Sequence, residues 1–212
     1  MTSPSPSPRV TLVRHGQSTW NERSLIQGQN DDAELTQRGQ GEALSAANAL
    51  KSVGFTHIVS SDLRRARQTA EIIAAVLELD VTNDQRLRER CFGSLEGQSL
   101  GLLGPDSSGI TDGVLVDPDA RPAGGESFRD VVIRAGSFLD DTLDSLGDSQ
   151  LLVVTHGGAI RALHAYVLDT ALEGLEMMAV GNCSIWDLIP TSGSVAHAPR
   201  QHGGEQNRNL TE

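Results

Sequence analysis

The chain has 212 residues, and its 17 Lys and Arg side chains face 28 Asp and Glu, for a formal net charge of −11. This length fits one domain, or at most two. The acidity argues against a nucleic-acid binder and against attachment to an anionic membrane, because both partners are held by positive surfaces. Aromatic residues make up only 3% of the chain, which also disfavours stacking on nucleobases.

The basic residues are almost all arginine, with Lys51 as the single lysine. A guanidinium group matches the geometry of a phosphate or a carboxylate. Codon bias in a GC-rich genome is the simpler explanation of the excess of arginine over lysine. Composition alone therefore does not predict an anion site.

The spacing of the cysteines and the lack of long apolar stretches predict a cytoplasmic protein. Cys91 and Cys183 lie far apart, in no disulfide or metal-binding pattern, and none of the six histidines has a short metal-ligand spacing. No stretch approaches the roughly 18 apolar residues that span a bilayer, and the N-terminus lacks an apolar signal core. The sequence contains no P-loop, GxGxxG, GxSxG or HExxH motif, so we expect neither a metal nor a cofactor.

Composition divides the chain into a folded body and two polar ends. Residues 1–8 alternate Ser and Pro and are expected to form a flexible tail. Residues 191–212 are polar and are also expected to be loose. The body, residues 9–190, is predicted to be a single domain, in which residues 97–125 form a long loop or lid rich in Gly, Pro and Asp.

Strand-like and helix-like segments alternate within this body. Strands are predicted over 10–13, 55–60, 151–155 and 184–189, and amphipathic helices over 36–51, 62–79, 126–146 and 157–168. Thr36 is the expected N-cap of the first helix, which should bury Ala43, Leu44, Ala47 and Leu50. This alternation predicts an α/β layered protein with a largely parallel sheet.

Ligands of such sheets bind outside the carboxyl ends of the strands. The first strand ends at Arg14 and His15, the second leads through Ser60 and Ser61 to Arg65, and the third ends at His156, before Gly157. Two histidines and several arginines are thus expected to converge on one edge.

Such a set of side chains suits a dianionic phosphate. Arginines bind its oxygens and neutralise its charge, and free N–H groups at a helix start add to this. One neutral imidazole can attack phosphorus, while another stabilises the transferred group. A carboxylic acid must protonate the leaving oxygen, and Glu89 is the best candidate.

Taken singly, these residues have simpler explanations. A lone His15 at a strand end is more often a packed histidine, and a lone Arg65 or Glu89 is more often a solvated surface charge. Arg64 and Arg67 are expected on other faces of their helix. Arg161 and His164 are expected to be structural or surface residues. Only the convergence of three strand ends favours a site.

Five ordered segments and a final strand carry a family resemblance. They are LVRHGQSTWN (12–21), SSDLRRARQTA (60–70), LRERCFGSLEG (87–97), AGGES (123–127), VVTHGGAIRAL (153–163) and NCSI (182–185). In this order they resemble the histidine phosphatase superfamily, which includes phosphoglycerate mutases, fructose-2,6-bisphosphatases and cobalamin-pathway phosphatases. The resemblance implies a phosphoglycerate mutase-like fold, a three-layer αβα sandwich with a mostly parallel central sheet.

The resemblance also implies residue roles. It makes His15 the phosphorylated nucleophile and Glu89 the proton donor and later the base. The implied phosphate pocket is formed by Arg14, Asn21, Gln27, Gly28, Arg65, His156 and Gly157.

The chain departs from the family at two places. Many relatives carry Arg where this chain has Leu25; either Arg23 substitutes for it or a contact to a second anionic group is lost. Cys91 stands where relatives often have His, and it is either a packed thiol or one activated by nearby arginines.

The lid and the C-terminal end decide between hydrolysis and mutase chemistry. Mutases of the family hold the substrate carboxylate with arginines of a long lid and close the site with a basic tail. Here residues 98–120 contain no Arg or Lys. We therefore predict a phosphomonoesterase acting on a small phosphorylated metabolite. The alternatives are a mutase and a non-catalytic module that binds phosphorylated ligands; a homodimer stays open.

Overall fold

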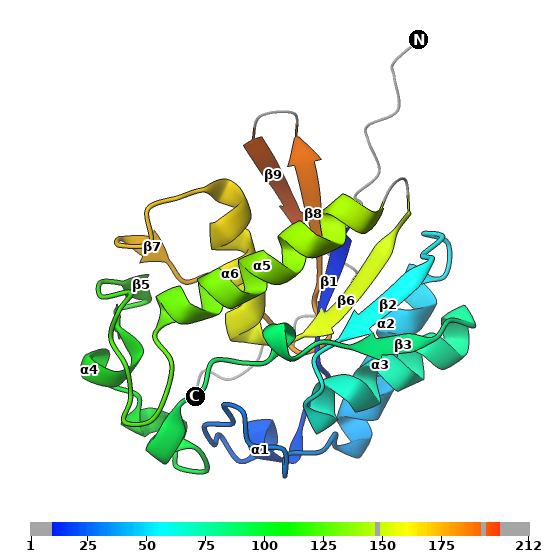
Figure 1. Cartoon of the computed structure of the whole chain (residues 1–212). Helices are drawn as coiled ribbons and strands as arrows, with labels where there is room; N and C mark the ends of the chain where they lie inside the picture. The colour runs from blue at the N-terminus through cyan, green and yellow to red at the C-terminus, as the bar shows by residue number, and fades with distance from the viewer. Residues whose placement is uncertain (1–9, 147–148, 192–193, 200–212) are drawn as a thin grey trace, which may run out of the picture.

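The computed structural model describes residues 10–146, 149–191 and 194–199. Its central sheet has six strands in the order β3-β2-β6-β1-β8-β9 (Figure 1). These strands are β1 (Val10–Arg14), β2 (His57–Ser60), β3 (Val81–Asn83), β6 (Leu151–Thr155), β8 (Ile185–Thr191) and β9 (Ser194–Pro199). The first four in spatial order are parallel, while β8 runs antiparallel to β1 and β9 antiparallel to β8.

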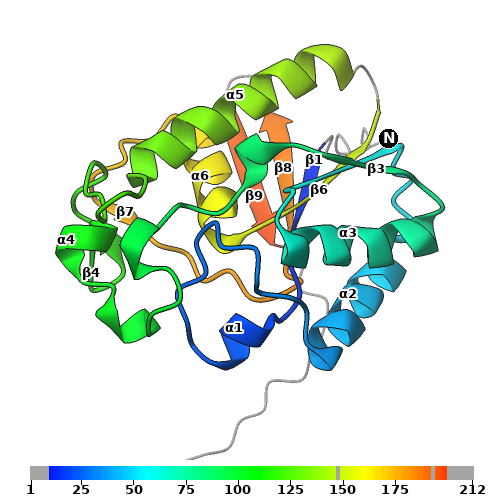
Figure 2. The same ribbon diagram turned by 60° about the horizontal axis from the view of Figure 1, so that its bottom comes forward.

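Two pairs of helices cover the sheet. One face carries α2 (Gln37–Leu50) and α3 (Arg64–Leu77), and the other carries α5 (Phe128–Leu146) and α6 (Gly157–Leu168) (Figures 1 and 2). The predicted α/β fold, with a mostly parallel sheet between helices, is confirmed.

Alternation along the central strands builds a core on each side of the sheet. Val10 and Leu12 of β1 pack in the cluster of α5 and α6, whereas Val13 belongs to the cluster of α2 and α3. All five residues of β6 are buried, as expected for a strand that helices cover on both faces.

Most predicted elements appear with small shifts at their ends. The segments 151–155 and 157–168 match β6 and α6. Thr36 is the N-cap of α2, because its Oγ1 accepts the N–H of Gly39 at 3.0 Å. The prediction for Leu44 is wrong: it is 49% exposed, and Ala46 is buried instead.

The predicted lid contains regular structure that its sequence does not reveal. It holds α4 (Pro105–Ser108) and the hairpin of β4 (Ile110–Thr111) and β5 (Val114–Leu115), which pairs with β7 (Leu175–Glu176) in a small second sheet. The remaining short elements are α1 (Thr19–Glu22) and three 3₁₀ turns, Gln85–Leu87, Gly93–Leu95 and Leu100–Leu102. These elements escape periodicity because two to four residues are too few to show a period.

The chain ends were predicted to be loose. Within the C-terminal segment 191–212 this prediction is wrong for Ser194–Pro199, which form β9 and pair with β8. Residues 1–8 and 200–212 lie outside the described residues. Among the helices of the described part, none is long and apolar enough to cross a membrane.

Candidate active site

The topology produces a crevice between β1 and β6. These strands are parallel neighbours, with Arg14 of β1 opposite Thr155 of β6. The long helices that follow them, α2 and α6, pack on opposite faces, which leaves a gap at the carboxyl ends of the strands. His15 and His156 follow these ends, and their ring centroids are 5.1 Å apart.

A cavity of about 360 Å³ opens at this point. It brings together nearly all residues predicted for the site; those that line it are Arg14, His15, Asn21, Gln27, Gly28, Arg65, Glu89 and Gly157. His156 is fully buried and contacts the His15 ring at the base of the site.

His15 is held as a neutral imidazole with a defined tautomer. Its Nδ1 lies 2.8 Å from the carbonyl oxygen of Gly16. Because a carbonyl only accepts, Nδ1 carries the proton and Nε2 keeps its lone pair. Burial, followed by the charges of Arg65 and Arg14, holds the pKa of His15 well below its usual range. At neutral pH this side chain is therefore a candidate nucleophile.

His156 has the complementary arrangement. Its Nε2 lies 2.8 Å from the Oγ of Ser61, and the N–H of Leu63 donates to that same oxygen at 3.4 Å. Burial and the charge of Arg65 hold the pKa of His156 well below its usual range. Ser61 thus holds the orientation of the His156 ring through Nε2.

Arg14 and Arg65 are fixed by backbone carbonyls. Arg65 Nη1 and Nη2 donate to Asn30 and Gly28 at 3.0 and 2.7 Å, and Arg14 Nη1 donates to Val180 at 2.6 Å. Burial lowers the pKa of Arg65 to about 10, so the group stays charged at neutral pH.

Each of these three residues has one buried nitrogen without a hydrogen-bond partner among the described residues: Arg14 Nε, Arg65 Nε and His156 Nδ1. Leaving a buried donor unpaired costs about 1–3 kcal/mol. The two guanidinium nitrogens belong to residues that line the cavity, and the His156 ring contacts His15 beside it, so the site suits a ligand that has several acceptor oxygens.

Asn21 adds a fourth donor. Its Oδ1 accepts the N–H of Ser18 at 3.1 Å and Asn182 Nδ2 at 3.2 Å. With the oxygen fixed in this way, the amide group presents Nδ2 as a donor.

The loop of Gln27 and Gly28 is fitted closely to its neighbours. Gly28 has φ +50°, and a Cβ there would collide with Glu96 Oε1, which already accepts the N–H of Gln29 at 2.9 Å. Glycine at this position lets the Gly28 carbonyl reach Arg65.

Glu89 lies at the N-terminus of α6. Its Oε2 accepts the N–H of Gly158 at 3.0 Å, and its Oε1 accepts the N–H of Arg90 at 2.8 Å. A carboxyl group in this place faces the positive end of the helix dipole and lines the cavity.

An ion pair secures the loop that carries Glu89. Arg134 of α5 donates to the carbonyls of Arg86, Arg88 and Glu89 at 2.7–2.9 Å. The same guanidinium pairs with Glu126, whose Oε2 accepts the N–H of Cys91 at 2.9 Å. Glu126 belongs to the AGGES segment, so this motif helps to fix the backbone on both sides of Glu89.

Sequence reasoning missed several residues of the site. Arg161, predicted to be structural or on the surface, lines the cavity and donates from Nε to the Met178 carbonyl at 2.8 Å. Its position four residues after Gly157, on the same helix face, was the available signal. Ser61, although quoted at the strand end, was given no role.

The other predictions for this region have mixed outcomes. His164 is buried and packs edge-on against Trp186, as expected for a structural residue. Arg64 is half-exposed and paired with Glu34. Leu25 lines the cavity, whereas Arg23 is exposed and is not among the residues that line it, so Arg23 does not replace the missing arginine.

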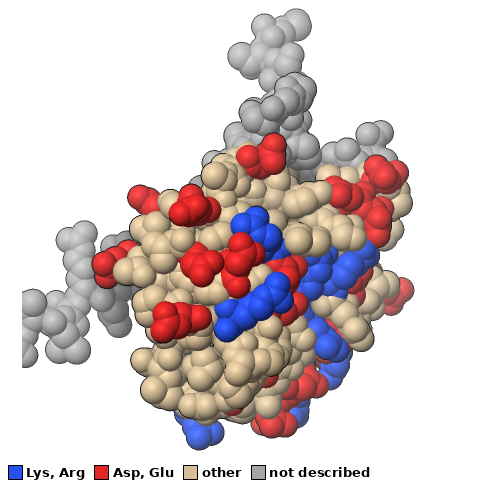
Figure 3. All heavy atoms as spheres, turned by 60° about the vertical axis from the view of Figure 1, so that its left-hand side comes forward, with Lys and Arg blue, Asp and Glu red and all other residues tan. Residues whose placement is uncertain are grey.

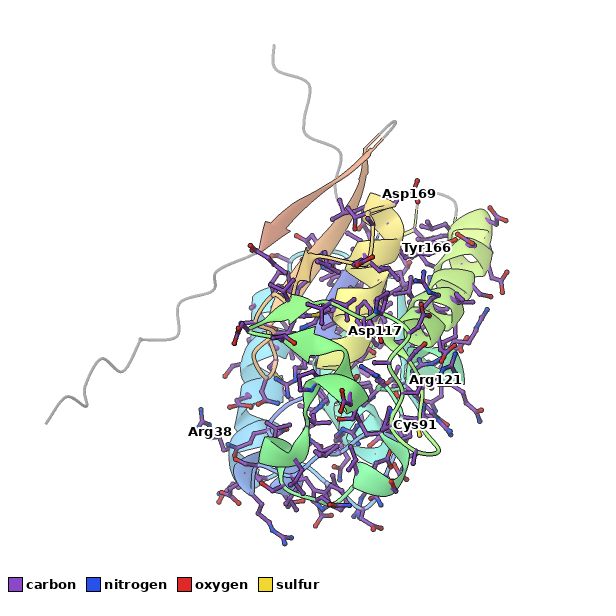
Figure 4. The ribbon with its side chains drawn as sticks, turned by 90° about the vertical axis from the view of Figure 1, so that its left-hand side faces the viewer. Arg38, Cys91, Asp117, Arg121, Tyr166 and Asp169 are labelled. Carbon is purple, nitrogen blue, oxygen red and sulfur yellow. The ribbon has the colours of Figure 1, made fainter. Side chains whose placement is uncertain are left out.

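Cys91 is partly buried and is not among the residues that line the cavity. Figure 4 shows it on the lid side of the molecule with Arg121, and its Sγ lies 3.7 Å from the Gly124 carbonyl. Partial burial raises the pKa of Cys91 above its usual value, which opposes the thiolate form.

Positive charge outside the pocket is neutralised locally. On the face in Figure 3, basic and acidic side chains are interspersed. Ion pairs among the described residues include Arg121–Asp130 and Arg129–Asp119. Within the described residues, no three His, Cys, Asp or Glu side chains are grouped as metal ligands would be.

The fold and the site together define a class: an α/β protein in which two histidines and two arginines meet at a topological switch point of the sheet. Residues 10–197 match the model of the histidine phosphatase superfamily, branch 1. The chain therefore belongs to the histidine phosphatase superfamily and is an enzyme of that group.

Its relatives carry two kinds of names. A probable phosphoglycerate mutase GpmB from Cronobacter sakazakii is 36% identical over 207 residues, covering 89% of this chain and 94% of the relative. Mycobacterial glucosyl-3-phosphoglycerate phosphatase, solved with VO3, superimposes with a TM-score of 0.76 at 31% identity, covering 93% of this chain and all of the other. YhfR of Bacillus stearothermophilus reaches a TM-score of 0.80 at 28% identity, covering 92% and 97% of the two chains.

Proposed function

We propose that this protein is a phosphomonoesterase that hydrolyses a small phosphorylated metabolite through a phosphohistidine on His15. One observation carries the proposal. A buried, neutral His15, with Nδ1 bonded to Gly16 and Nε2 free, stands beside the unpartnered donors of Arg14, Arg65 and His156.

The first half-reaction follows from these positions. The phosphoryl oxygens take up the donors of the pocket, with Arg14 and Arg65 neutralising their charge. The lone pair of His15 Nε2 forms the N–P bond while the P–O bond to the leaving alcohol breaks. The carboxyl group of Glu89 gives its proton to the departing oxygen.

The second half-reaction restores the enzyme. Water attacks the phosphohistidine and gives a proton to the Glu89 carboxylate, the N–P bond breaks, and phosphate leaves with His15 neutral again. The arginines supply the positive charge in this scheme, so we infer that no metal is needed and that EDTA does not inhibit.

Hydrolysis is favoured over mutase activity by the residues on the lid side of the cavity. The lid lines it with Leu100, Leu103, Ser108 and Ile110, which include no cation that could hold a second anionic group. The mycobacterial relative is named a phosphatase, whereas the curated relatives are named probable mutases.

The test measures hydrolysis and mutase activity in the same experiment. The enzyme is incubated with 3-phosphoglycerate and with p-nitrophenyl phosphate, with and without EDTA, and inorganic phosphate and 2-phosphoglycerate are quantified. We expect phosphate release from p-nitrophenyl phosphate that EDTA leaves unchanged, and little 2-phosphoglycerate. Formation of 2-phosphoglycerate faster than phosphate release would assign the protein to the mutases.

A further inference from the structure

The polarity of the cavity lining differs between its base and its mouth. At the base lie the polar groups of Arg14, His15 and Arg65. Toward the lid and the facing loops the lining contains Ser24, Ser108, Arg90 and Arg161, but the larger share is apolar: Leu25, Phe92, Leu100, Leu103, Ile110 and Val180.

This apolar part is built before any ligand binds. The lid pairs with the loop after α1, because Leu100 N–H donates to Ser24 at 2.9 Å and Ile26 N–H donates to Gln98 at 2.8 Å. Leu25 forms a β-bridge with Ser99 between these bonds. Backbone hydrogen bonds therefore set Leu25 and Leu100 in place on the wall.

Leu100 is 53% exposed even though it lines the cavity. A large exposed apolar side chain at the mouth of a polar pocket is typical of a ligand-binding surface.

The two arginines near the mouth, Arg90 and Arg161, donate hydrogen bonds to backbone carbonyls. Arg90 donates to four backbone carbonyls, those of Ser107, Ser108, Ala120 and Glu126, at 2.7–3.0 Å. Arg161 donates from Nε to the Met178 carbonyl at 2.8 Å. The Arg90 guanidinium is therefore bound to backbone carbonyls through all three of its nitrogens.

We propose that the mouth, with Leu25 and Leu100 at its centre, is a leaving-group subsite for an uncharged, apolar alcohol. The inference rests on the proposed phosphatase function and narrows its substrate class to alkyl or aryl phosphate monoesters. An apolar leaving group gains free energy by burial against these side chains. A carboxylate placed against Leu25 and Leu100 loses hydration that these two side chains cannot replace.

The test compares phosphate esters of primary alcohols, which have similar leaving-group acidity. We expect kcat/KM to rise two- to fourfold per methylene from ethyl to hexyl phosphate until the subsite is filled. We also expect n-butyl phosphate to exceed 3-carboxypropyl phosphate at least tenfold. A flat alkyl series, or equal rates for these two esters, would overturn the proposal.

Two neighbouring leucines provide a matched pair of variants. Leu100 lines the cavity, whereas Leu102, 56% exposed on the same turn, does not. Leu100→Arg is expected to flatten the alkyl series and to improve 3-carboxypropyl phosphate relative to butyl phosphate at least tenfold. Leu102→Arg should keep the wild-type preference. The same change of preference in both variants would contradict the subsite, because it would reflect added surface charge.

Failure of the subsite is distinguishable from failure of the proposed function. Thermal unfolding shows that each variant is folded, and p-nitrophenyl phosphate reports phosphoryl transfer itself. If the wild-type protein hydrolyses no ester, the phosphatase proposal falls. If it hydrolyses p-nitrophenyl phosphate but ignores alkyl length, only the subsite falls.

Discussion

Gly158 lies directly against the carboxylate of Glu89. A Cβ at Gly158 would stand 2.0 Å from Glu89 Oε1, and the Gly158 N–H donates to Glu89 Oε2 at 3.0 Å. The second glycine after His156 thus holds the proposed acid by its N–H and leaves room for it by lacking a side chain.

Gly158→Ala is therefore expected to displace Glu89 while the protein stays folded, because the colliding atom is the end of a flexible side chain. We predict that kcat for alkyl phosphates falls at least tenfold with a small change in Tm. The matched control is Gly41→Ala in α2, where a Cβ would meet nothing within 4 Å. It should keep wild-type kcat and raise stability by about 0.5–1 kcal/mol. Unchanged kcat in Gly158→Ala would show that the position of Glu89 does not matter.

Glu89→Gln removes the transferable proton but keeps the shape of the side chain. We expect kcat to fall by roughly 10²–10⁴-fold for alkyl phosphates. For p-nitrophenyl phosphate, whose leaving group needs no protonation, the fall in the first half-reaction should be much smaller. Burst kinetics separate the two half-reactions. Equal effects on the first step for both esters would exclude Glu89 as the general acid.

Arg134→Lys tests the ion pair that secures the Glu89 loop. Lysine cannot reproduce the planar set of donors that binds three carbonyls and Glu126. We predict at least a tenfold fall in kcat for alkyl phosphates, with KM and the rate for p-nitrophenyl phosphate changed less. The control is Arg129→Lys on the same helix, in an exposed pair with Asp119. Similar losses for both esters would indicate general loosening and not a displaced acid.

His15→Ala removes the proposed nucleophile. We expect p-nitrophenyl phosphate hydrolysis to fall by at least about a thousandfold, with a native circular dichroism spectrum. His57→Ala replaces an exposed histidine at the start of β2 and should retain activity. Alkaline quenching should trap phosphohistidine in the wild-type enzyme only. Substantial turnover by His15→Ala would disprove the nucleophile assignment.

The two buried histidines also predict how stability depends on pH. The pKa values of His15 and His156 are lowered well below 6.5 by burial and by neighbouring arginines. The unfolded chain takes up protons at these residues near pH 6.5, and the folded protein does so only at lower pH, so falling pH favours unfolding. Below pH 6.5 each histidine should reduce the free energy of unfolding by up to about 1.4 kcal/mol per pH unit, and above it neither contributes.

Urea unfolding between pH 7.5 and 5.5 measures this dependence. The slope below pH 6.5 should be smaller in His15→Asn, which lacks one of the two groups, and unchanged in His57→Asn. Identical slopes in wild-type protein and His15→Asn would contradict a lowered pKa for His15.

Much of the fold could be predicted because its central elements are long and strongly patterned. The segments 151–155 and 157–168 appear as predicted because apolar residues fill β6 completely and the interior face of α6. Leu44 was misplaced because helical periodicity cannot distinguish adjacent positions at the edge of an apolar face, and neighbouring side chains decide which of them is covered. β9 was missed because its pairing with β8 depends on a partner strand and not on its own composition.

The sequence also predicted part of the candidate site. Arg14, His15 and His156 could be assigned to the site because they stand at the ends of predicted strands, and the carboxyl ends of parallel strands meet at one edge of the sheet. The apolar mouth was not predicted, because Leu25 and Leu100 become neighbours only when the lid pairs with the loop after α1.

The amino-acid pattern was sufficient to predict the alternation of strands and helices, the edge of the sheet at which the histidines and arginines gather, and the family. Local pattern and strand order suffice for this, because they constrain the backbone. Three further features became visible in the folded protein alone: the proton position on His15, the hydrogen bonds of Arg134 to the Glu89 loop, and those of Arg90 to lid carbonyls. These features depend on hydrogen bonds and burial between segments far apart in the chain, whose spacing no local pattern encodes.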